Sequence, residues 1–266
     1  MQLNSEARNL DSDITALVSY CFGMSSEESA LMLADAEENG ARFVNVSDGK
    51  PVSSLFSKEL MLRSGGAAHR CMYIFGLCTA PEFRGRGLAS GLIDEACRQS
   101  EAEFALLIPE REELYGFYEK LGFLANGAAA VFDVAAEGTE NVKRCENVQN
   151  AYAAYRSAVA VCDNICLLSE SDFSFSMRVC GNECFEGEKS FCIVGDGSIK
   201  EIIAPRERIE GFAASVMKLC GIGSAKAPAP VALAPENAEV VKLGMIKRLK
   251  DTEPPQSFYV NNLYNL

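Results

Sequence analysis

Most of the structural information in this 266-residue chain lies in the stretch Gly76-Leu77-Cys78-Thr79-Ala80-Pro81-Glu82-Phe83-Arg84-Gly85-Arg86-Gly87-Leu88-Ala89. The segment 70–79 is largely apolar, which is typical of a central strand. Apolar residues then recur at helical spacing, at Leu88, Leu92, Ile93 and Ala96. A strand that leads through a glycine loop into a helix leaves backbone N–H groups unpaired at the positive end of the helix dipole. The stretch therefore predicts an anion-binding loop.

The segments on either side extend this pattern. Ser25 and Glu28 have capping-box spacing, which predicts a helix over 26–39. Asp48-Gly49 is a two-residue hairpin signal, because both positions tolerate positive φ. The expected order is β-β-β-α-β-α-β, with strands at 41–47, 52–62, 70–79, 105–108 and from about 123, and helices at 86–100 and 112–121.

Two motifs carry a resemblance to a known family. Arg84, Gly87 and Ala89 satisfy the signature Arg/Gln-x-x-Gly-x-Gly/Ala, and they stand after a strand and before a helix. Tyr118-Glu119-Lys120-Leu121-Gly122-Phe123 follows at the distance of that family's second motif. Through both motifs, residues 41–135 resemble the GNAT N-acetyltransferases. The resemblance implies an α/β architecture with a mixed sheet, the acyl-CoA N-acyltransferase (GNAT) fold.

This resemblance implies acetyl-CoA as the acetyl donor and no metal. In the family, the strand that here ends at 77–79 pairs with the pantetheine arm like an added strand. The pyrophosphate would lie on the N–H groups from Arg84 to Ala89, where glycine lets the backbone approach closely. The other interpretation of the loop is an ordinary strand-to-helix turn. The implied coenzyme-binding residues are Leu77, Cys78, Thr79, Arg84, Gly85, Arg86, Gly87, Leu88, Ala89 and Ser90.

Tyr118 is the catalytic acid that the resemblance implies, since it matches the family tyrosine beside the coenzyme sulfur. A phenol with a pKa of about 10 is protonated at neutral pH and can donate to the departing thiolate. Tyr118 also fits a core aromatic that shares a helix face with Leu114 and Leu121. The expected oxyanion donor is the backbone N–H of Leu77 or Cys78.

The general base is less well specified. His69 is the only histidine, and its Gly/Ala-rich surroundings favour a solvated loop residue. Cys78 suits the core better than a covalent mechanism, because no basic partner for its thiol is evident in the sequence. The tandem arrangement described next resembles the enhanced-intracellular-survival type, in which the terminal carboxylate helps to deprotonate the amine. By that analogy Leu266 would supply the carboxylate, although the chain is too short for that type's third, sterol-carrier-like domain.

The second half of the sequence resembles a degenerate copy of the first. Residues 136–147 are polar and lack apolar periodicity, which predicts a linker between a catalytic GNAT domain at 1–135 and a second domain at 148–266 that shapes the acceptor pocket. Ala204-Pro205-Arg206-Glu207 stands opposite the glycine loop and contains no glycine. Three landmarks recur in order: helix 86–100 with 206–219, Pro109-Glu110 with Pro235-Glu236, and Lys120-Leu121-Gly122 with Lys242-Leu243-Gly244. Further strands are expected at 164–168, 173–179, 190–194 and 199–204.

The composition limits the classes of binding partner that we expect. The formal net charge of −12 repels phosphate backbones and anionic lipid and attracts a cationic molecule. The start of the chain has no signal-peptide pattern and no apolar run reaches the roughly 18 residues of a membrane span, so we expect a cytoplasmic protein. The eleven cysteines suit reduced, buried thiols, and the spacings Cys162/Cys166 and Cys180/Cys184 lie outside the usual zinc knuckle.

We therefore expect an N-acetyltransferase that moves an acetyl group from acetyl-CoA to a primary amine by direct attack in a ternary complex. A cationic small molecule such as an aminoglycoside or a polyamine is the favoured acceptor. One alternative is a protein lysine or N-terminal acetyltransferase. The other is a non-catalytic acyl-CoA-binding sensor or structural paralogue. No nucleic-acid or membrane partner is expected, and a homo-oligomer stays open.

Overall fold

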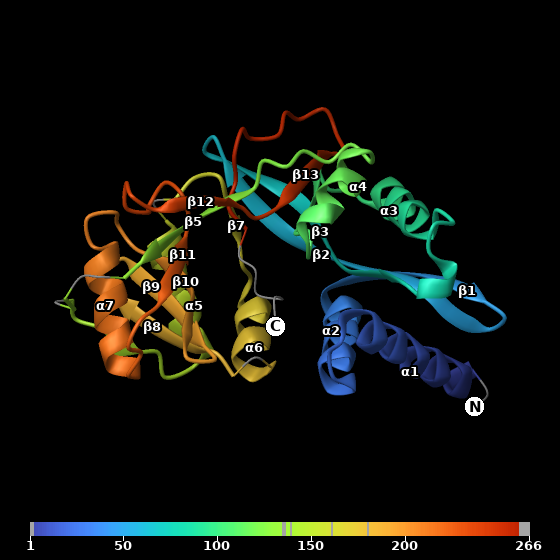
Figure 1. Ribbon diagram of the computed structural model, residues 1–266, viewed down its shortest axis with the longest axis horizontal. Coiled ribbons are helices and arrows are strands. Elements are labelled where there is room, and N and C mark those ends of the chain that lie inside the picture. Colours follow the sequence, from blue (N-terminus) through green and yellow to red (C-terminus); the bar gives the residue numbers. More distant parts are fainter. Residues whose placement is uncertain (1–2, 135–136, 139, 161, 180, 261–266) are drawn as a thin grey trace. The chain divides into compact units, whose positions relative to one another are not determined.

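The computed structural model describes all residues except 1–2, 135–136, 139, 161, 180 and 261–266. The chain divides into two compact units, and each draws on both halves of the sequence (Figure 1). The first unit comprises Met1–Leu60, Arg70–Leu124 and Ile246–Pro254, and the second comprises Met61–His69, Ala125–Met245 and Pro255–Leu266. Residues 136–147 therefore belong to the second unit, where Lys143–Arg144 form the short strand β6.

The first unit begins with two helices, α1 (Leu3–Phe22) and α2 (Ser26–Asn39). The capping box predicted for α2 is present: the Glu28 N–H donates to Ser25 Oγ at 3.1 Å, and the Ser25 N–H donates to the Glu28 carboxylate at 2.6 Å. Helix α1 has no counterpart among the expected elements. Its buried side chains, Ile14, Leu17 and Val18, recur at helical spacing and form part of the core.

The first unit is built on a mixed β-sheet. Asp48 and Gly49 adopt φ of 50° and 77°, as the hairpin signal predicted. Strand β3 pairs with β4 in parallel, and β4 has β13 as its other neighbour. The strand order is β1 (Gly40–Ser47), β2 (Lys50–Ser64), β3 (Ala67–Thr79), β4 (Phe104–Leu107) and β13 (Met245–Arg248). The helical segments after β3 are η1 (Pro81–Phe83), α3 (Leu88–Gln99), η2 (Glu112–Leu114) and α4 (Tyr115–Glu119).

The second unit repeats the element order of the first. Both halves run α-α-β-β-β-α-β, apart from the short strand β7 (Ile165–Leu167) between the two helices of the second half. The repeated elements are α5 (Val148–Val159), α6 (Glu170–Val179), β8 (Glu183–Gly187), β9 (Ser190–Gly195), β10 (Ser198–Ile203), α7 (Ile209–Cys220) and β11 (Lys226–Ala229). This order confirms the internal duplication.

The last strand of each half joins the sheet of the other unit. Strand β5 (Ala128–Asp133), from the first half, lies between β11 and β12 (Glu239–Lys242) and is antiparallel to both. Strand β13, from the second half, is the neighbour of β4. The strand expected from about residue 123 thus begins at Ala128, and Leu124 forms only an isolated bridge with Ile246.

One expectation about the second half was wrong. Residues 173–179 form part of helix α6, because Ser169 and Asp172 cap one another: the Asp172 N–H donates to Ser169 Oγ at 3.2 Å and the Ser169 N–H to Asp172 Oδ2 at 2.7 Å. The alternation of apolar and polar residues in Phe173-Ser174-Phe175 favoured a strand, so the capping signal at Ser169 and Asp172 was overlooked. Residues 231–233, before Pro235, form a turn, and the strand that follows helix α7 is β11.

Candidate active site

The loop between β3 and α3 presents backbone N–H groups at a helix start. Gly87 is the N-cap of α3 in a left-handed conformation, with φ of 77°, and no side chain caps the helix. Gly85 has φ of 74°, and a Cβ placed there would have no neighbour within 4 Å. The first amides of a helix, here those of Leu88, Ala89 and Ser90, have no partner within the helix. The loop is therefore an open cradle for an anion.

Two arginines fix the course of this loop and remain exposed. Arg84 Nε donates to the carbonyl of Thr79 at 3.0 Å, so its side chain ties the loop back to the end of β3. Arg86 Nη2 donates to the carbonyl of Glu82 at 2.8 Å, and its guanidinium lies 4.9 Å from the centre of the Phe83 ring. Both cations stand beside the cradle and add positive charge to an otherwise acidic chain.

Strand β3 continues beyond its pairing with β4. The ladder contains three pairs, from Cys71 and Phe104 to Tyr73 and Leu106, so residues 74–79 extend past its end. On the other edge of β3, Ser54 Oγ donates to the carbonyl of Gly76 at 3.3 Å and Ser53 Oγ to the carbonyl of Cys78 at 2.8 Å. Backbone groups alternate in direction along a strand. The N–H and C=O of Leu77 therefore face the edge of β3 on which the ladder with β4 has already ended. This favours the Leu77 N–H over that of Cys78 as the oxyanion donor.

Gly76 sits where the strand changes course. Its φ is +59°, and a Cβ at this position would lie 2.5 Å from Cδ2 of Phe56. Only glycine combines that backbone conformation with such a close approach. Gly76 therefore sets the direction in which the backbone of Leu77 points.

Tyr118 lies on α4, in the same unit as the loop. Its side chain is only 8% exposed and packs edge-on against Phe117 and Phe123, so the expectation of a core aromatic is correct as far as the ring is concerned. Burial, with a smaller contribution from the Glu110 carboxylate, raises the pKa of Tyr118 to about 12. The phenol is therefore a proton donor throughout the physiological range.

The sequence did not single out Cys21, whose pKa responds to two residues of the candidate site. Its thiol is half-buried on the last turn of α1, and the influence of Cys78 and Arg84 lowers its pKa to about 7 although burial opposes the shift. Cys21 is more than fifty residues from Cys78, and α1 was not expected, so no spacing in the sequence connects the two. Of the remaining candidates, His69 belongs to the part of β3 that clusters with the second unit, and Leu266 lies outside the described residues.

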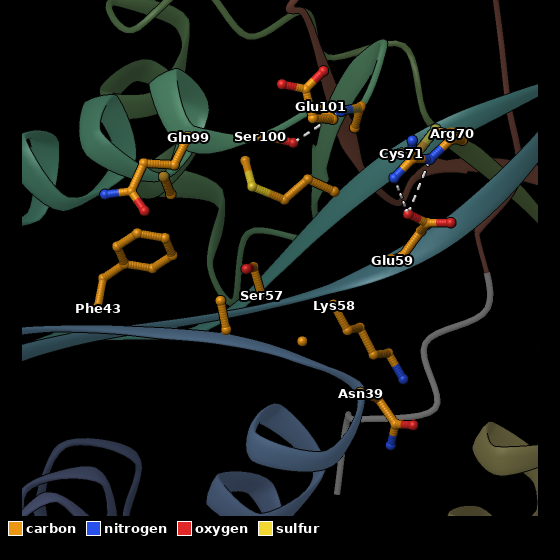
Figure 2. Close-up of a pocket in the computed structure, with 15 residues that line it drawn as sticks. Asn39, Phe43, Ser57, Lys58, Glu59, Arg70, Cys71, Gln99, Ser100 and Glu101 are labelled. Atoms are coloured by element: carbon orange, nitrogen blue, oxygen red, sulfur yellow. Dashed lines mark hydrogen bonds and ion pairs between the residues drawn. The ribbon is translucent and has the colours of Figure 1, made fainter.

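A separate cavity of about 320 Å³ lies near the opposite end of α3, where Gln99 and Ser100 line it (Figure 2). Helix α3 has 12 residues, and at 1.5 Å per residue its two ends are roughly 18 Å apart. Lys58 also lines the cavity and pairs with Asp35 at 3.6 Å, with both side chains only 3% exposed. The cavity is therefore distinct from the glycine loop.

The second unit has no comparable loop between β10 and α7. Residues 204–208 contain no glycine, and the N-cap of α7 is Arg208. The Arg208 guanidinium pairs with the carboxylates of Glu140 and Glu188. This local arrangement supports the prediction that the second copy is degenerate.

Within the part of the chain that the structure describes, two kinds of feature are not found. No group of three or more His, Cys, Asp or Glu side chains is arranged to hold a metal ion. No helix there has the length and apolarity needed to cross a membrane.

Comparisons with known proteins agree with this geometry. A family model described as an acetyltransferase (GNAT) domain matches residues 10–125, whereas no curated protein sequence gives a significant match. A GCN5-related N-acetyltransferase from Kribbella flavida is 19% identical, with a TM-score of 0.69 over 91% of this chain and 70% of its own. One from Anabaena variabilis is 15% identical, with a TM-score of 0.70 over 92% and 71%. Eis1 from Mycobacterium abscessus is 10% identical, with a TM-score of 0.64 over 89% and 70%. The fold likeness thus extends well beyond the residues of the family match.

Proposed function

We propose that the chain transfers an acetyl group from acetyl-CoA to a primary amine, because residues 10–125 match a family model described as an acetyltransferase (GNAT) domain. The observation that carries this proposal is the glycine cradle at the start of α3, which stands directly after a strand whose ladder with β4 ends at Tyr73. A diphosphate needs N–H donors and close backbone approach, and the cradle offers both. The residues present therefore fit the coenzyme.

The proposed coenzyme contacts divide between loop and strand. The amides from Arg84 to Ala89, with the Arg86 side chain, would hold the diphosphate, and Ser90 borders them. Ser90 Oγ itself donates to the Gly87 carbonyl at 2.9 Å, so it holds the helix start in place. The backbone of Leu77 and Thr79 would pair with the pantetheine arm. When bound, acetyl-CoA supplies an acetyl group activated as a thioester.

The chemistry asks three things of the protein. The Leu77 N–H would stabilise negative charge on the acetyl oxygen as a neutral amine attacks. The Tyr118 hydroxyl would donate to the departing thiolate, and its raised pKa keeps it protonated for this role. The amine must lose a proton, and a terminal carboxylate at Leu266 stays a prediction for that step.

We propose a cationic small molecule, such as a polyamine or an aminoglycoside, as the acceptor. The whole chain has a net charge of −12. Glu110, whose carboxylate acts electrostatically on Tyr118, is followed by the exposed acids Glu112 and Glu113. Negative charge close to the proposed acid raises the local concentration of a cation.

Calorimetry with acetyl-CoA, followed by a coenzyme-thiol release assay against a panel of amines, tests the proposal. The panel contains polyamines, aminoglycosides, a lysine peptide and a peptide with a free N-terminus. We expect acetyl-CoA to bind and the cationic small molecules to release the most thiol. Binding without release from any amine would favour the sensor alternative, and release only with peptides would favour a protein acetyltransferase. If acetyl-CoA does not bind, the small-molecule acetyltransferase, the protein acetyltransferase and the acyl-CoA sensor are all overturned.

Two arginine variants, one in the loop before α3 and one on α3, sharpen the test. Arg86→Ala should weaken acetyl-CoA binding by about tenfold, as expected for a lost charge-assisted contact of about 1.4 kcal/mol. Arg98→Ala removes an equal charge from the exposed last turn of α3 and should leave the affinity unchanged. Equal losses in both variants would show that overall charge, not the loop, governs binding.

A further inference from the structure

Two consecutive serines on β2 are buried against the end of β3. The side chains of Ser53 and Ser54 are both in residues that are 0% exposed, and a buried hydroxyl costs free energy unless it is hydrogen-bonded. Ser54 Oγ donates to the carbonyl of Gly76 at 3.3 Å. Ser53 Oγ donates to the carbonyl of Cys78 at 2.8 Å. The two hydroxyls therefore bind the backbone carbonyls on either side of Leu77.

Each hydroxyl makes a second contact with β3. Ser53 Oγ lies 2.9 Å from Thr79 Oγ1, and Ser54 Oγ lies 3.3 Å from Cys78 Sγ. A hydroxyl has one hydrogen to donate, and each serine uses it on a carbonyl, so in these second contacts the serine oxygen is the acceptor. Each serine thus donates to one group of β3 and accepts from another, which fixes the orientation of its side chain.

These hydrogen bonds also fix the direction of two backbone N–H groups. A peptide unit is planar and trans, so its C=O and its N–H point in opposite directions. The Gly76 carbonyl shares a peptide unit with the Leu77 N–H, and the Cys78 carbonyl shares one with the Thr79 N–H. Because both carbonyls face β2, both N–H groups face the other edge of β3, on which the ladder with β4 has already ended.

The second copy has no hydroxyl at the corresponding positions. Strand β10 is followed by Ala204-Pro205, as β3 is followed by Ala80-Pro81, so the last residues of the two strands correspond. Residues 202–203 of β10 pair with Cys192 and Phe191 on β9. These two side chains therefore stand where the first copy has its serines. The buried hydroxyls occur in the copy that has the glycine cradle, which indicates a role at that site and not in the fold that both copies share.

We propose that Ser54 is a positioning residue for the oxyanion donor and that Ser53 is a positioning residue for a coenzyme-binding amide. This inference rests on the acetyl transfer proposed above. Ser54 directs the Leu77 N–H at the acetyl oxygen, and Ser53 directs the Thr79 N–H at the pantetheine arm. A donor stabilises developing charge best when it already points at the place where that charge appears. One serine therefore acts on the chemical step and the other on coenzyme binding.

Isotope-edited infrared spectroscopy tests the role of Ser54. The acetyl carbonyl of acetyl-CoA, labelled with carbon-13, absorbs at a lower frequency when it accepts a hydrogen bond. The band is recorded on protein saturated with the coenzyme, so that a change in affinity does not affect it. We expect a downward shift on binding to the wild type and the loss of most of that shift in Ser54→Ala. Ser190→Ala is the matched control and should keep the full shift, since its buried hydroxyl donates to the carbonyl of Glu188 at 3.0 Å in the second unit.

Calorimetry with acetyl-CoA tests the role of Ser53. Ser53→Ala should weaken binding by about three- to tenfold, as expected for one poorly directed hydrogen bond, and should keep most of the infrared shift. Ser54→Ala should show the reverse, with a larger effect on the band than on the affinity. A purely structural role would affect both measurements alike in the two variants. Equal effects of that kind would overturn the assignment of separate roles.

The remaining outcomes separate this inference from the proposed function. An unchanged band in Ser54→Ala would overturn the role of Ser54 while coenzyme binding stands. Where an alanine variant does not fold, Ser53→Cys and Ser54→Cys replace it, because a thiol keeps the side-chain size and is a weaker donor. Each should show a smaller effect in the same direction, and wild-type values would overturn the role. If acetyl-CoA binds the wild type without a shift of the band, Leu77 is not the donor and the inference fails alone. If acetyl-CoA does not bind, both proposals fail.

Discussion

Gly76→Ala is expected to destabilise the protein and to disturb the proposed oxyanion donor. Two terms contribute in the structure. An L-residue at φ of +59° costs about 1–2 kcal/mol, and the new Cβ would lie 2.5 Å from Cδ2 of Phe56, an overpacking that costs about 1–3 kcal/mol. The loss of glycine's freedom in the unfolded chain returns about 0.4–1 kcal/mol. We expect a net loss of about 3 kcal/mol.

Gly66→Ala provides the matched control. Gly66 also has a positive φ, of 76°, but its Cβ would have no neighbour within 4 Å. This variant carries the backbone cost without the clash, so we expect a loss of about 1 kcal/mol. The free energy of unfolding is measured by urea titration, and the turnover of each variant is compared under conditions where it stays folded.

The difference between the two glycine variants isolates the contact with Phe56. The double variant Gly76→Ala/Phe56→Leu should recover at least about 1 kcal/mol relative to the sum of the single variants, because the smaller side chain relieves the contact. If Gly76→Ala is no less stable than Gly66→Ala, the close approach does not constrain the strand. Gly76 then does not orient the Leu77 backbone either.

Three further predictions follow from the same geometry. Tyr118→Phe should lower turnover by about 10- to 1000-fold and leave the calorimetric affinity for acetyl-CoA nearly unchanged; an unaltered rate would remove Tyr118 from the mechanism. Because the pKa of Tyr118 is raised to about 12, its protonated form persists as pH rises, so the rate profile should show no loss from this phenol below pH 10. Asp35→Asn should cost about 3–5 kcal/mol in urea titration, since it removes a buried carboxylate charge 3.6 Å from the buried Lys58, whereas Glu59→Gln, in an exposed pair with Arg70, should cost at most about 1 kcal/mol.

Local signals in the sequence were sufficient for several elements of the first unit, including the glycine loop. The capping box at Ser25, the hairpin at Asp48-Gly49 and the glycine loop before α3 each depend on residues within a few positions of one another. Such signals act through backbone conformation and through hydrogen bonds close in the chain, so they survive without knowledge of the fold. The same kind of signal was present at Ser169, but alternating phenylalanines outweighed it.

The pairing of strands between halves could not be predicted from local pattern. The local sequence of β5 predicts a strand but does not indicate which strands it pairs with. Its neighbours β11 and β12 are about a hundred residues away. The free energy that selects these partners comes from burial in a sheet formed by another part of the chain. A duplicated sequence offers each terminal strand two similar sheets, and only the full fold decides between them.

In the candidate site, too, some features depend on residues close in the sequence and others on residues far along the chain. Its backbone donors could be located from the sequence because glycines and a helix start mark where main chain must lie open. The lowered pKa of Cys21 could not be predicted in this way, because it depends on Cys78 and Arg84, which lie far along the chain. In the second copy, Arg208 and its carboxylate partners occupy the helix start that glycine leaves open in the first. A helix start whose cation is already paired within the protein has less charge to offer an anion. The loss of the glycines and the gain of the ion pairs therefore act in the same direction.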